Sequence, residues 1–108
     1  MVTKDLEIVK EIFSLIESGI VFGCDYFCYE VEVGEGYMES VLTVEKDGVE
    51  VTDADTDFNS AKLYRLIKEL RAEGKARGEE WLSFAISYRR EGEVKTKFNG
   101  SKGDRFIL

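Results

Sequence analysis

The chain has 108 residues, 44% of them hydrophobic, and a formal net charge of −7. This length is that of one domain, and the apolar content is enough for a core, which excludes a disordered chain. The sequence contains no histidine, which excludes Ser–His and Cys–His catalysts and every histidine metal site.

The charge is distributed unevenly along the chain. Residues 1–59 hold 15 acidic and 3 basic side chains, whereas residues 60–108 hold 7 and 12. A fold with this polarity presents an acidic surface, which repels nucleic acid and attracts basic proteins. We therefore expect a protein partner and no nucleic-acid partner.

No apolar run approaches the roughly 20 residues that a membrane span requires. The N-terminal stretch alternates charged with apolar residues, unlike a signal peptide. We expect a cytoplasmic protein without a membrane partner. In that compartment Cys24 and Cys28 are expected to be reduced thiols, because their spacing without further ligands is no metal signature.

The first predicted element is a helix from about Lys4 to Ser18, with Thr3 as the N-cap and Asp5 in the first turn. Its apolar stripe comprises Leu6, Val9, Ile12, Phe13 and Ile16. The apolar segment Ile20–Gly23 follows, and we expect it to pack beneath a sheet.

Three strands are predicted next, over about Tyr26–Val33, Tyr37–Glu45 and Val49–Thr52. Two-residue turns at Glu35–Gly36 and Asp47–Gly48 connect them. The resulting register pairs Val33 with Met38, Val31 with Ser40, Tyr29 with Leu42, Phe27 with Val44, and Val44 with Val51. Both hairpins then have the same apolar face, which we expect to be buried.

An acidic loop, Asp53–Phe58, separates these strands from the second helix. It opens like a calcium-binding loop, but Phe58 stands where such a loop needs glycine and Tyr64 where it needs a bidentate glutamate. We expect a solvated loop that precedes the helix and binds no metal.

The second predicted helix runs from about Ser60 to Arg77. Its apolar stripe comprises Leu63, Leu66, Ile67 and Leu70. Basic residues coat the rest: Lys62, Arg65, Lys68, Arg71, Lys75 and Arg77. Because Glu69 and Glu73 interrupt this coat, we interpret it as a solvated helix face and not as a nucleic-acid site.

A hairpin closes the predicted fold within residues 78–98. Its first strand alternates, with Leu82, Phe84, Ile86 and Tyr88 on the face expected to be buried. A three-residue loop, with Gly92 in the left-handed conformation, pairs Phe84 with Phe98 and Arg89 with Glu93. Trp81 falls on the face opposite Phe84, where it either covers a sheet edge or the end of the second helix, or is an exposed interface anchor.

The order α-β-β-β-α-β-β predicts a single α+β domain over residues 1–108, with a mostly antiparallel sheet of about five strands and two helices on one face. No arrangement of residues marks a catalytic site, so we expect no enzyme and no cofactor.

The predicted registers also define an acidic sheet face. It carries Glu30, Glu32, Glu39, Glu45 and Glu50, with Glu32 opposite Glu39 and Glu45 opposite Glu50. Directly opposed like charges are destabilising. The face is either a sheet surface kept soluble by charge or a site whose charge a basic partner neutralises. Secondary candidates for binding are Asp53, Asp55, Asp57 and Trp81.

The second half of the chain resembles the YezG-like family of bacterial antitoxin or immunity proteins. The resemblance rests on Leu66, Leu70 and Arg71, then Gly78-Glu79-Glu80-Trp81, Ser83, Gly92 and Phe98. After its closing Phe the family usually continues with an acidic, tyrosine-containing stretch, whereas here Asn99-Gly100-Ser101 follows. The resemblance implies binding and not catalysis, with a polymorphic toxin, often a nuclease, as the partner.

Two functional hypotheses follow from the sequence. In the first, the chain is an immunity protein, a monomer or weak dimer, that occludes the active site of a basic nuclease toxin with its acidic face. In the alternative, it is a small cytoplasmic protein-binding adaptor without a toxin partner.

Overall fold

The structure, a computed structural model, describes residues 3–34, 37–79, 81–100 and 103–105. The elements are α1 (Thr3–Gly19), β1 (Tyr26–Gly34), β2 (Tyr37–Lys46), β3 (Val49–Val51), α2 (Ser60–Ala76), β4 (Trp81–Arg89), β5 (Val94–Gly100) and β6 (Gly103–Arg105). The predicted α-β-β-β-α-β-β order is confirmed. The short strand β6 is added after it, in a tail whose sequence gave no strand signal.

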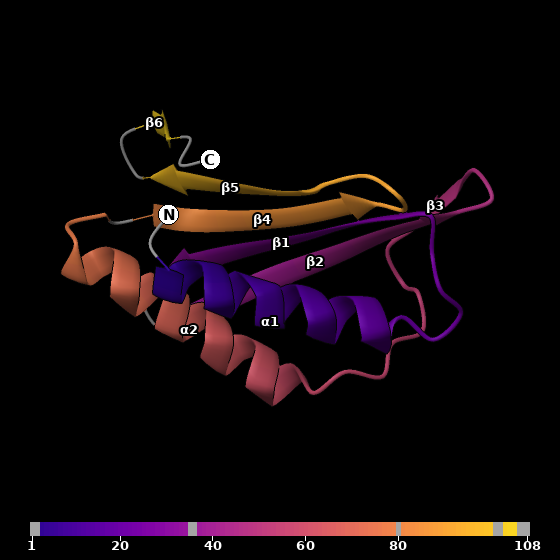
Figure 1. Cartoon of the computed structure of the whole chain (residues 1–108), viewed down its shortest axis with the longest axis horizontal. Helices are drawn as coiled ribbons and strands as arrows, with labels where there is room; N and C mark the ends of the chain where they lie inside the picture. Colours follow the sequence, from indigo (N-terminus) through magenta and orange to yellow (C-terminus); the bar gives the residue numbers. More distant parts are fainter. Residues whose placement is uncertain (1–2, 35–36, 80, 101–102, 106–108) are drawn as a thin grey trace.

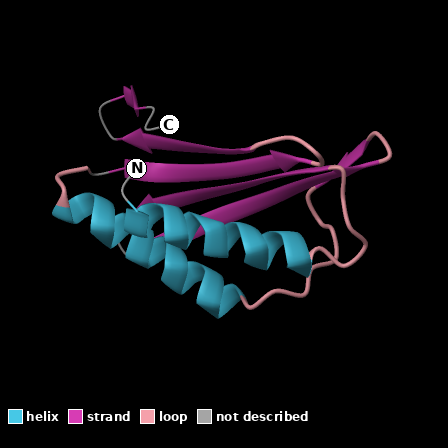
Figure 2. Ribbon diagram, in the orientation of Figure 1, coloured by secondary structure: helices cyan, strands magenta, loops and turns pink. Residues whose placement is uncertain are grey.

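The strands form one antiparallel sheet in the order β3-β2-β1-β4-β5-β6. Both helices cover the same face of this sheet, and the other face is open (Figures 1 and 2). The core lies between the helices and the covered face, and its fully buried side chains include Ile12, Ile16, Phe27, Leu63, Ile67, Phe84 and Ile86. In the described part of the chain no helix is long and apolar enough to cross a membrane.

The hairpin registers are as predicted. Phe27 lies opposite Val44, and Val44 lies opposite Val51. In the last hairpin Phe84 lies opposite Phe98. Alternating apolar residues fix these registers, because a slip of one residue would move the whole apolar set to the open face. The residues of the first turn, 35 and 36, lie outside the described part of the chain.

The prediction for the start of β4 was wrong. Trp81 is only 5% exposed and packs against Phe84 and Phe98, with ring centroids 6.0 and 5.4 Å away, whereas Leu82 is exposed. The register of β4 with β5 shifts between Trp81 and Ser83. Such a bulge inserts one residue and reverses the faces on one side of it. Trp81 is therefore a core residue and not an exposed anchor.

The turn between β4 and β5 also differs from the prediction. The left-handed residue is Glu91, with φ of 66°, and not Gly92. Gly92 N–H donates to Arg89 O at 2.7 Å, and a side chain at position 92 would begin only 3.0 Å from that oxygen. Glycine is needed here for a close approach of backbone to backbone and not for its φ.

Helix α1 is rotated slightly from its predicted orientation. Leu6 is 45% exposed, whereas Asp5 and Ile8 are buried. Thr3 lies within the helix and does not precede it. In the segment after the helix, Ile20 is buried but Phe22 is exposed, so the expectation that the whole apolar segment packs beneath the sheet was wrong.

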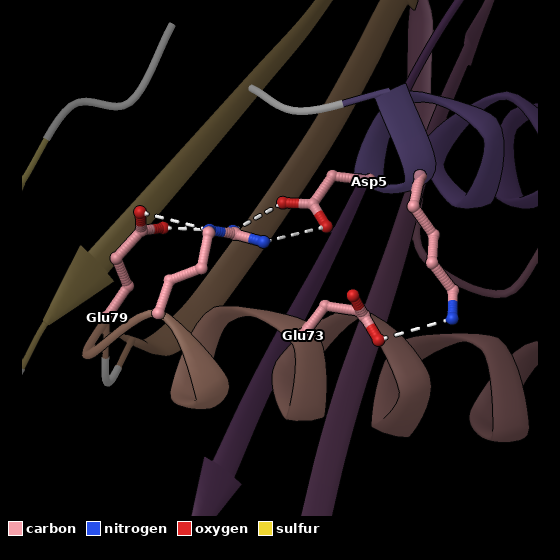
Figure 3. A network of polar contacts seen from close by, with 5 residues as sticks. Asp5, Glu73 and Glu79 are labelled. Carbon is pink, nitrogen blue, oxygen red and sulfur yellow. Dashed lines mark hydrogen bonds and ion pairs between the residues drawn. The ribbon is translucent and has the colours of Figure 1, made fainter.

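A polar network joins the start of α1 to the end of α2 (Figure 3). The guanidinium of Arg77 donates to both carboxylate oxygens of Asp5, at 3.3 and 2.5 Å, and to Glu79 Oε1 at 3.1 Å. The bonds to both carboxylates raise the pKa of Arg77, and Arg77 lowers the pKa of Glu79. Lys4 adds an ion pair to Glu73 at 3.3 Å. The buried Asp5 carboxylate is thereby held by a bidentate partner.

Candidate functional site

The open face of the sheet is built from side chains that alternate with the core residues along each strand. Three rows cross it in parallel. Each row is given from β2 to β5: Glu39, Glu32, Ser83 and Asn99; then Val41, Glu30, Ala85 and Lys97; then Thr43, Cys28, Ser87 and Lys95. The carboxylates therefore lie on β1 and β2, the lysines lie on β5, and the small residues of β4 lie between them.

Three of the predicted glutamates form a compact acidic cluster, which we define as Glu30, Glu32 and Glu39. All three are exposed, and Glu32 lies directly opposite Glu39. They line a shallow depression of about 340 Å³ together with Ser83 and Asn99. No ion pair between described residues involves any of the three. The acidic cluster therefore presents three negative charges close together on a surface that neither helix covers.

The other two glutamates of the predicted face belong to a separate place. Glu45 lies opposite Glu50, as predicted, but it forms an ion pair with Arg89 at 3.2 Å. Arg89 lies opposite Tyr26 on β1 and over its ring, at 4.8 Å from the centroid. Glu45 lies six positions after Glu39 along β2, about 20 Å at the rise of a strand. All five glutamates lie on the open face, but only Glu30, Glu32 and Glu39 lie close to one another.

The acidic loop lies elsewhere. Asp53, Asp55 and Asp57 are exposed, and the loop backbone is fastened to the end of α1. Val21 N–H donates to Asp55 O at 3.1 Å, and Asp57 N–H donates to Gly19 O at 2.6 Å. This places the loop at the helical layer, away from the acidic cluster. Among the described residues no group of three or more Cys, Asp or Glu could hold a metal ion.

Two hollows between α2 and β2 were not predicted from the sequence. The larger, about 630 Å³, has an apolar floor that includes Val33 and Ile67 and is bordered by Lys68, Arg71 and Lys75. The smaller, about 190 Å³, is lined mainly by hydroxyl groups: Tyr29, Ser40, Thr52, Thr56, Ser60 and Tyr64. Tyr64 borders both, so the two hollows are neighbours, and we call them together the α2–β2 groove. The spacing of Lys68, Arg71 and Lys75 is the only signal in the sequence that could have indicated it.

Tyr29 is the most unusual group in this groove. Its side chain is 2% exposed, and its hydroxyl lacks a hydrogen-bond partner of acceptable geometry among the described residues. Burial raises the pKa of Tyr29 to about 12, against a small opposite effect of the Ser40 hydroxyl. A buried hydroxyl without a partner is destabilising.

The two cysteines carry no chemistry that the structure activates. Both are free and half-buried, and burial is the main cause that raises the pKa of each thiol. Reactive cysteines need the opposite shift, toward the thiolate. At Cys24 burial and the nearby carboxylates outweigh the opposite effect of Arg90 and Lys46, so neither thiol is activated as a nucleophile.

No protein-family model matches this chain, and a search of curated proteins finds no relative. The resemblance to YezG-like proteins therefore depends on the motif residues alone, and it stays a prediction.

Proposed function

We propose that the protein is an immunity protein that binds a basic nuclease toxin domain through the acidic cluster and occludes its active site. The proposal places the complex in the cytoplasm, where a nuclease toxin meets nucleic acid. Binding of this kind requires no cofactor and no catalytic residue in the immunity protein, which acts as a monomer.

The observation that carries the proposal is the acidic cluster itself. Glu32 faces Glu39 across the strand pair with Glu30 beside them, and the ion pairs between described residues include none of the three. A like-charge pair directly opposite destabilises a sheet by a few tenths to about 1 kcal/mol. A basic partner converts this repulsion into attraction, so the arrangement favours the bound state over the free one.

The expected partner chemistry follows from what a nuclease must do. A nuclease binds phosphates, so its active-site cleft carries lysine and arginine. Complementary charge raises the association rate of two proteins well above that of neutral surfaces, and salt reduces the effect. Neither helix covers the open face, so a partner can approach it directly (Figure 2).

The experiment is a neutralisation assay. Each toxin-domain reading frame next to the gene is expressed with the wild-type chain or with the double variant Glu32→Lys/Glu39→Lys, and growth and nuclease activity are measured. We expect wild type to protect and the double variant to associate with the toxin about 10-fold more slowly at low salt.

A matched control makes the same change in net charge elsewhere. Glu17 and Glu93 are exposed and lie outside the acidic cluster, so Glu17→Lys/Glu93→Lys should protect almost as well as wild type. If both double variants protect equally, the acidic cluster is not the binding site. If no toxin is neutralised by the wild-type chain, the adaptor hypothesis replaces the immunity hypothesis.

A further inference from the structure

Most of strand β2 has a neighbour on one side only. It pairs with β1 over its length, but β3 pairs with it only at Val44, Glu45 and Lys46. Figure 1 shows β3 at one end of the sheet, beside the last part of β2. From Tyr37 to Thr43 the second edge of β2 is therefore open among the described residues.

The backbone groups along this edge can be assigned. Lys46 and Val49 close the two-residue turn at Asp47–Gly48, so Lys46 and Val44 bond to β3. In an antiparallel strand successive residues direct their N–H and C=O to alternate sides. Met38, Ser40 and Leu42 are in phase with Val44, so their N–H and C=O groups point to the open edge. Such a row is a template for another strand.

The opposite edge of the sheet differs in its protection. Strand β5 pairs with β6 at Phe98, Asn99 and Gly100, and its remaining residues include Lys95 and Lys97. Lysine on an edge strand discourages the approach of another strand. The open edge of β2 carries one charged residue, Glu39, beside Val41 and Thr43. It is therefore better suited than the β5 edge to pair with another strand.

The two sides of the β2 edge carry opposite charge. On the open face lies the acidic cluster, with Glu39 on β2 itself. On the helical face lies the α2–β2 groove, bordered by Lys68, Arg71 and Lys75. The ion pairs between described residues include neither Lys68 nor Lys75, and Arg71 donates to the backbone oxygen of Trp81 at 3.3 Å. In the same helix Lys62 pairs with Glu11.

We propose that a strand of the partner protein adds to the open edge of β2, antiparallel to it and in line with β3. Side chains of that strand alternate between the two faces. Those beside Glu39 and Val41 are basic and lie against the acidic cluster, whereas those beside Met38 and Ser40 are acidic and lie in the α2–β2 groove. Hydrogen bonds between the two backbones supply the affinity, and the alternating charges determine the register of the added strand. This inference rests on the proposed function, since it names how the protein partner docks.

A second copy of this chain fits the edge poorly. Pairing of two β2 edges would place one acidic cluster beside the other, and the lysines of one groove beside those of the next. Like charges side by side destabilise such a pair on both faces. The charge pattern therefore favours a different protein over self-association.

The test uses a capped peptide, Thr-Val-Arg-Glu-Arg-Glu-Thr, and a control peptide in which the charges do not alternate, Thr-Val-Arg-Arg-Glu-Glu-Thr, so that no register places like charges on one face. Both have the same composition and no net charge. Amide hydrogen exchange of the wild-type chain is followed residue by residue by NMR. We expect the first peptide to slow exchange at Met38, Ser40 and Leu42 about 10-fold or more, and the control peptide to leave these amides unchanged.

Two variants at position 40 distinguish the effect of the backbone N–H from the effect of the side chain. Ser40→Pro removes the N–H that points to the open edge, where proline is tolerated, and should abolish the protection. Ser40→Ala keeps the N–H and should preserve it. If Ser40→Pro fails to fold, the exchange pattern of the wild-type chain still decides the question.

Equal binding of both peptides, or no protection at Met38, Ser40 and Leu42, would overturn the strand addition. The proposed function is judged separately, because toxin neutralisation by the wild-type chain and its loss in Glu32→Lys/Glu39→Lys do not depend on the edge. If Ser40→Pro and wild type neutralise the toxin equally, the proposed function stands, but strand addition at the open edge of β2 is refuted.

Discussion

The buried ion pair between Asp5 and Arg77 offers the sharpest test of how the two helices are held together. The Asp5 side chain is 5% exposed, and Arg77 donates to both of its oxygens. Truncation by Arg77→Ala leaves a carboxylate buried without its partner, which generally destabilises a protein by about 3–5 kcal/mol.

The environment of Arg77 lowers this estimate. Its side chain is 29% exposed, so water can approach the carboxylate once the guanidinium is gone. We expect a loss of about 2–3 kcal/mol, below the range for a fully buried pair because the site is partly open to water. For a domain of this size that loss lowers the melting temperature by about 10 °C. Urea unfolding at pH 7 and thermal unfolding measure both quantities.

Two further variants isolate the cause. Glu79 is 43% exposed, so Glu79→Gln should destabilise by no more than about 1 kcal/mol. In Asp5→Asn/Arg77→Ala the unpaired charge is absent, so this double variant should be more stable than Arg77→Ala alone. An Arg77→Ala protein within about 0.5 kcal/mol of wild type would refute the view that this pair joins the helix ends.

The remaining predictions concern Tyr29 and Glu39. Tyr29→Phe should raise the stability at pH 7 by about 1 kcal/mol, because it removes a buried hydroxyl without a partner; a loss of similar size would mean that the hydroxyl is bonded. The folded-state pKa of Tyr29, about 12, lies above the roughly 10 of an unfolded chain. Below pH 10 the hydroxyl is protonated in both states, so its ionisation does not lower the free energy of unfolding there. Wild type should therefore lose about 2–3 kcal/mol between pH 10 and 12 that Tyr29→Phe does not lose, as denaturant titrations at each pH would show. Glu39→Lys turns a like-charge pair into an opposite one and should raise the free energy of unfolding by roughly 0.5–1 kcal/mol at low salt, with the gain shrinking in 1 M salt; a gain that is independent of salt would contradict its electrostatic origin.

The sequence was sufficient for the hairpins because local signals determine them. The pairing of Phe27 with Val44, and of Phe84 with Phe98, follows from apolar alternation and from the length of each turn. The prediction failed at Trp81, where a bulge reverses the faces of one residue. Alternation alone cannot reveal an inserted residue, because the pattern Trp-Leu-Ser-Phe fits either face at its start.

Contacts between distant segments were the other limit. The sequence placed Glu45 on the acidic face, but the pairing of β1 with β4 brings Arg89 to it from 44 residues away. The α2–β2 groove and the Asp5–Arg77 pair likewise depend on how the helices lie on the sheet. Local periodicity shows which face of each element is apolar and leaves these neighbours undetermined.

The arrangement of charge on the open face has a consequence for the orientation of any partner. The sheet order places the acidic strands β1 and β2 on one side of β4 and the lysines of β5 on the other. In one row Glu30, Ala85 and Lys97 follow each other across the sheet. A basic protein is therefore attracted to one half of the face and repelled from the other. The attractive half ends at the open edge of β2, so electrostatic steering and the proposed strand addition would direct a basic partner to the same side of the molecule.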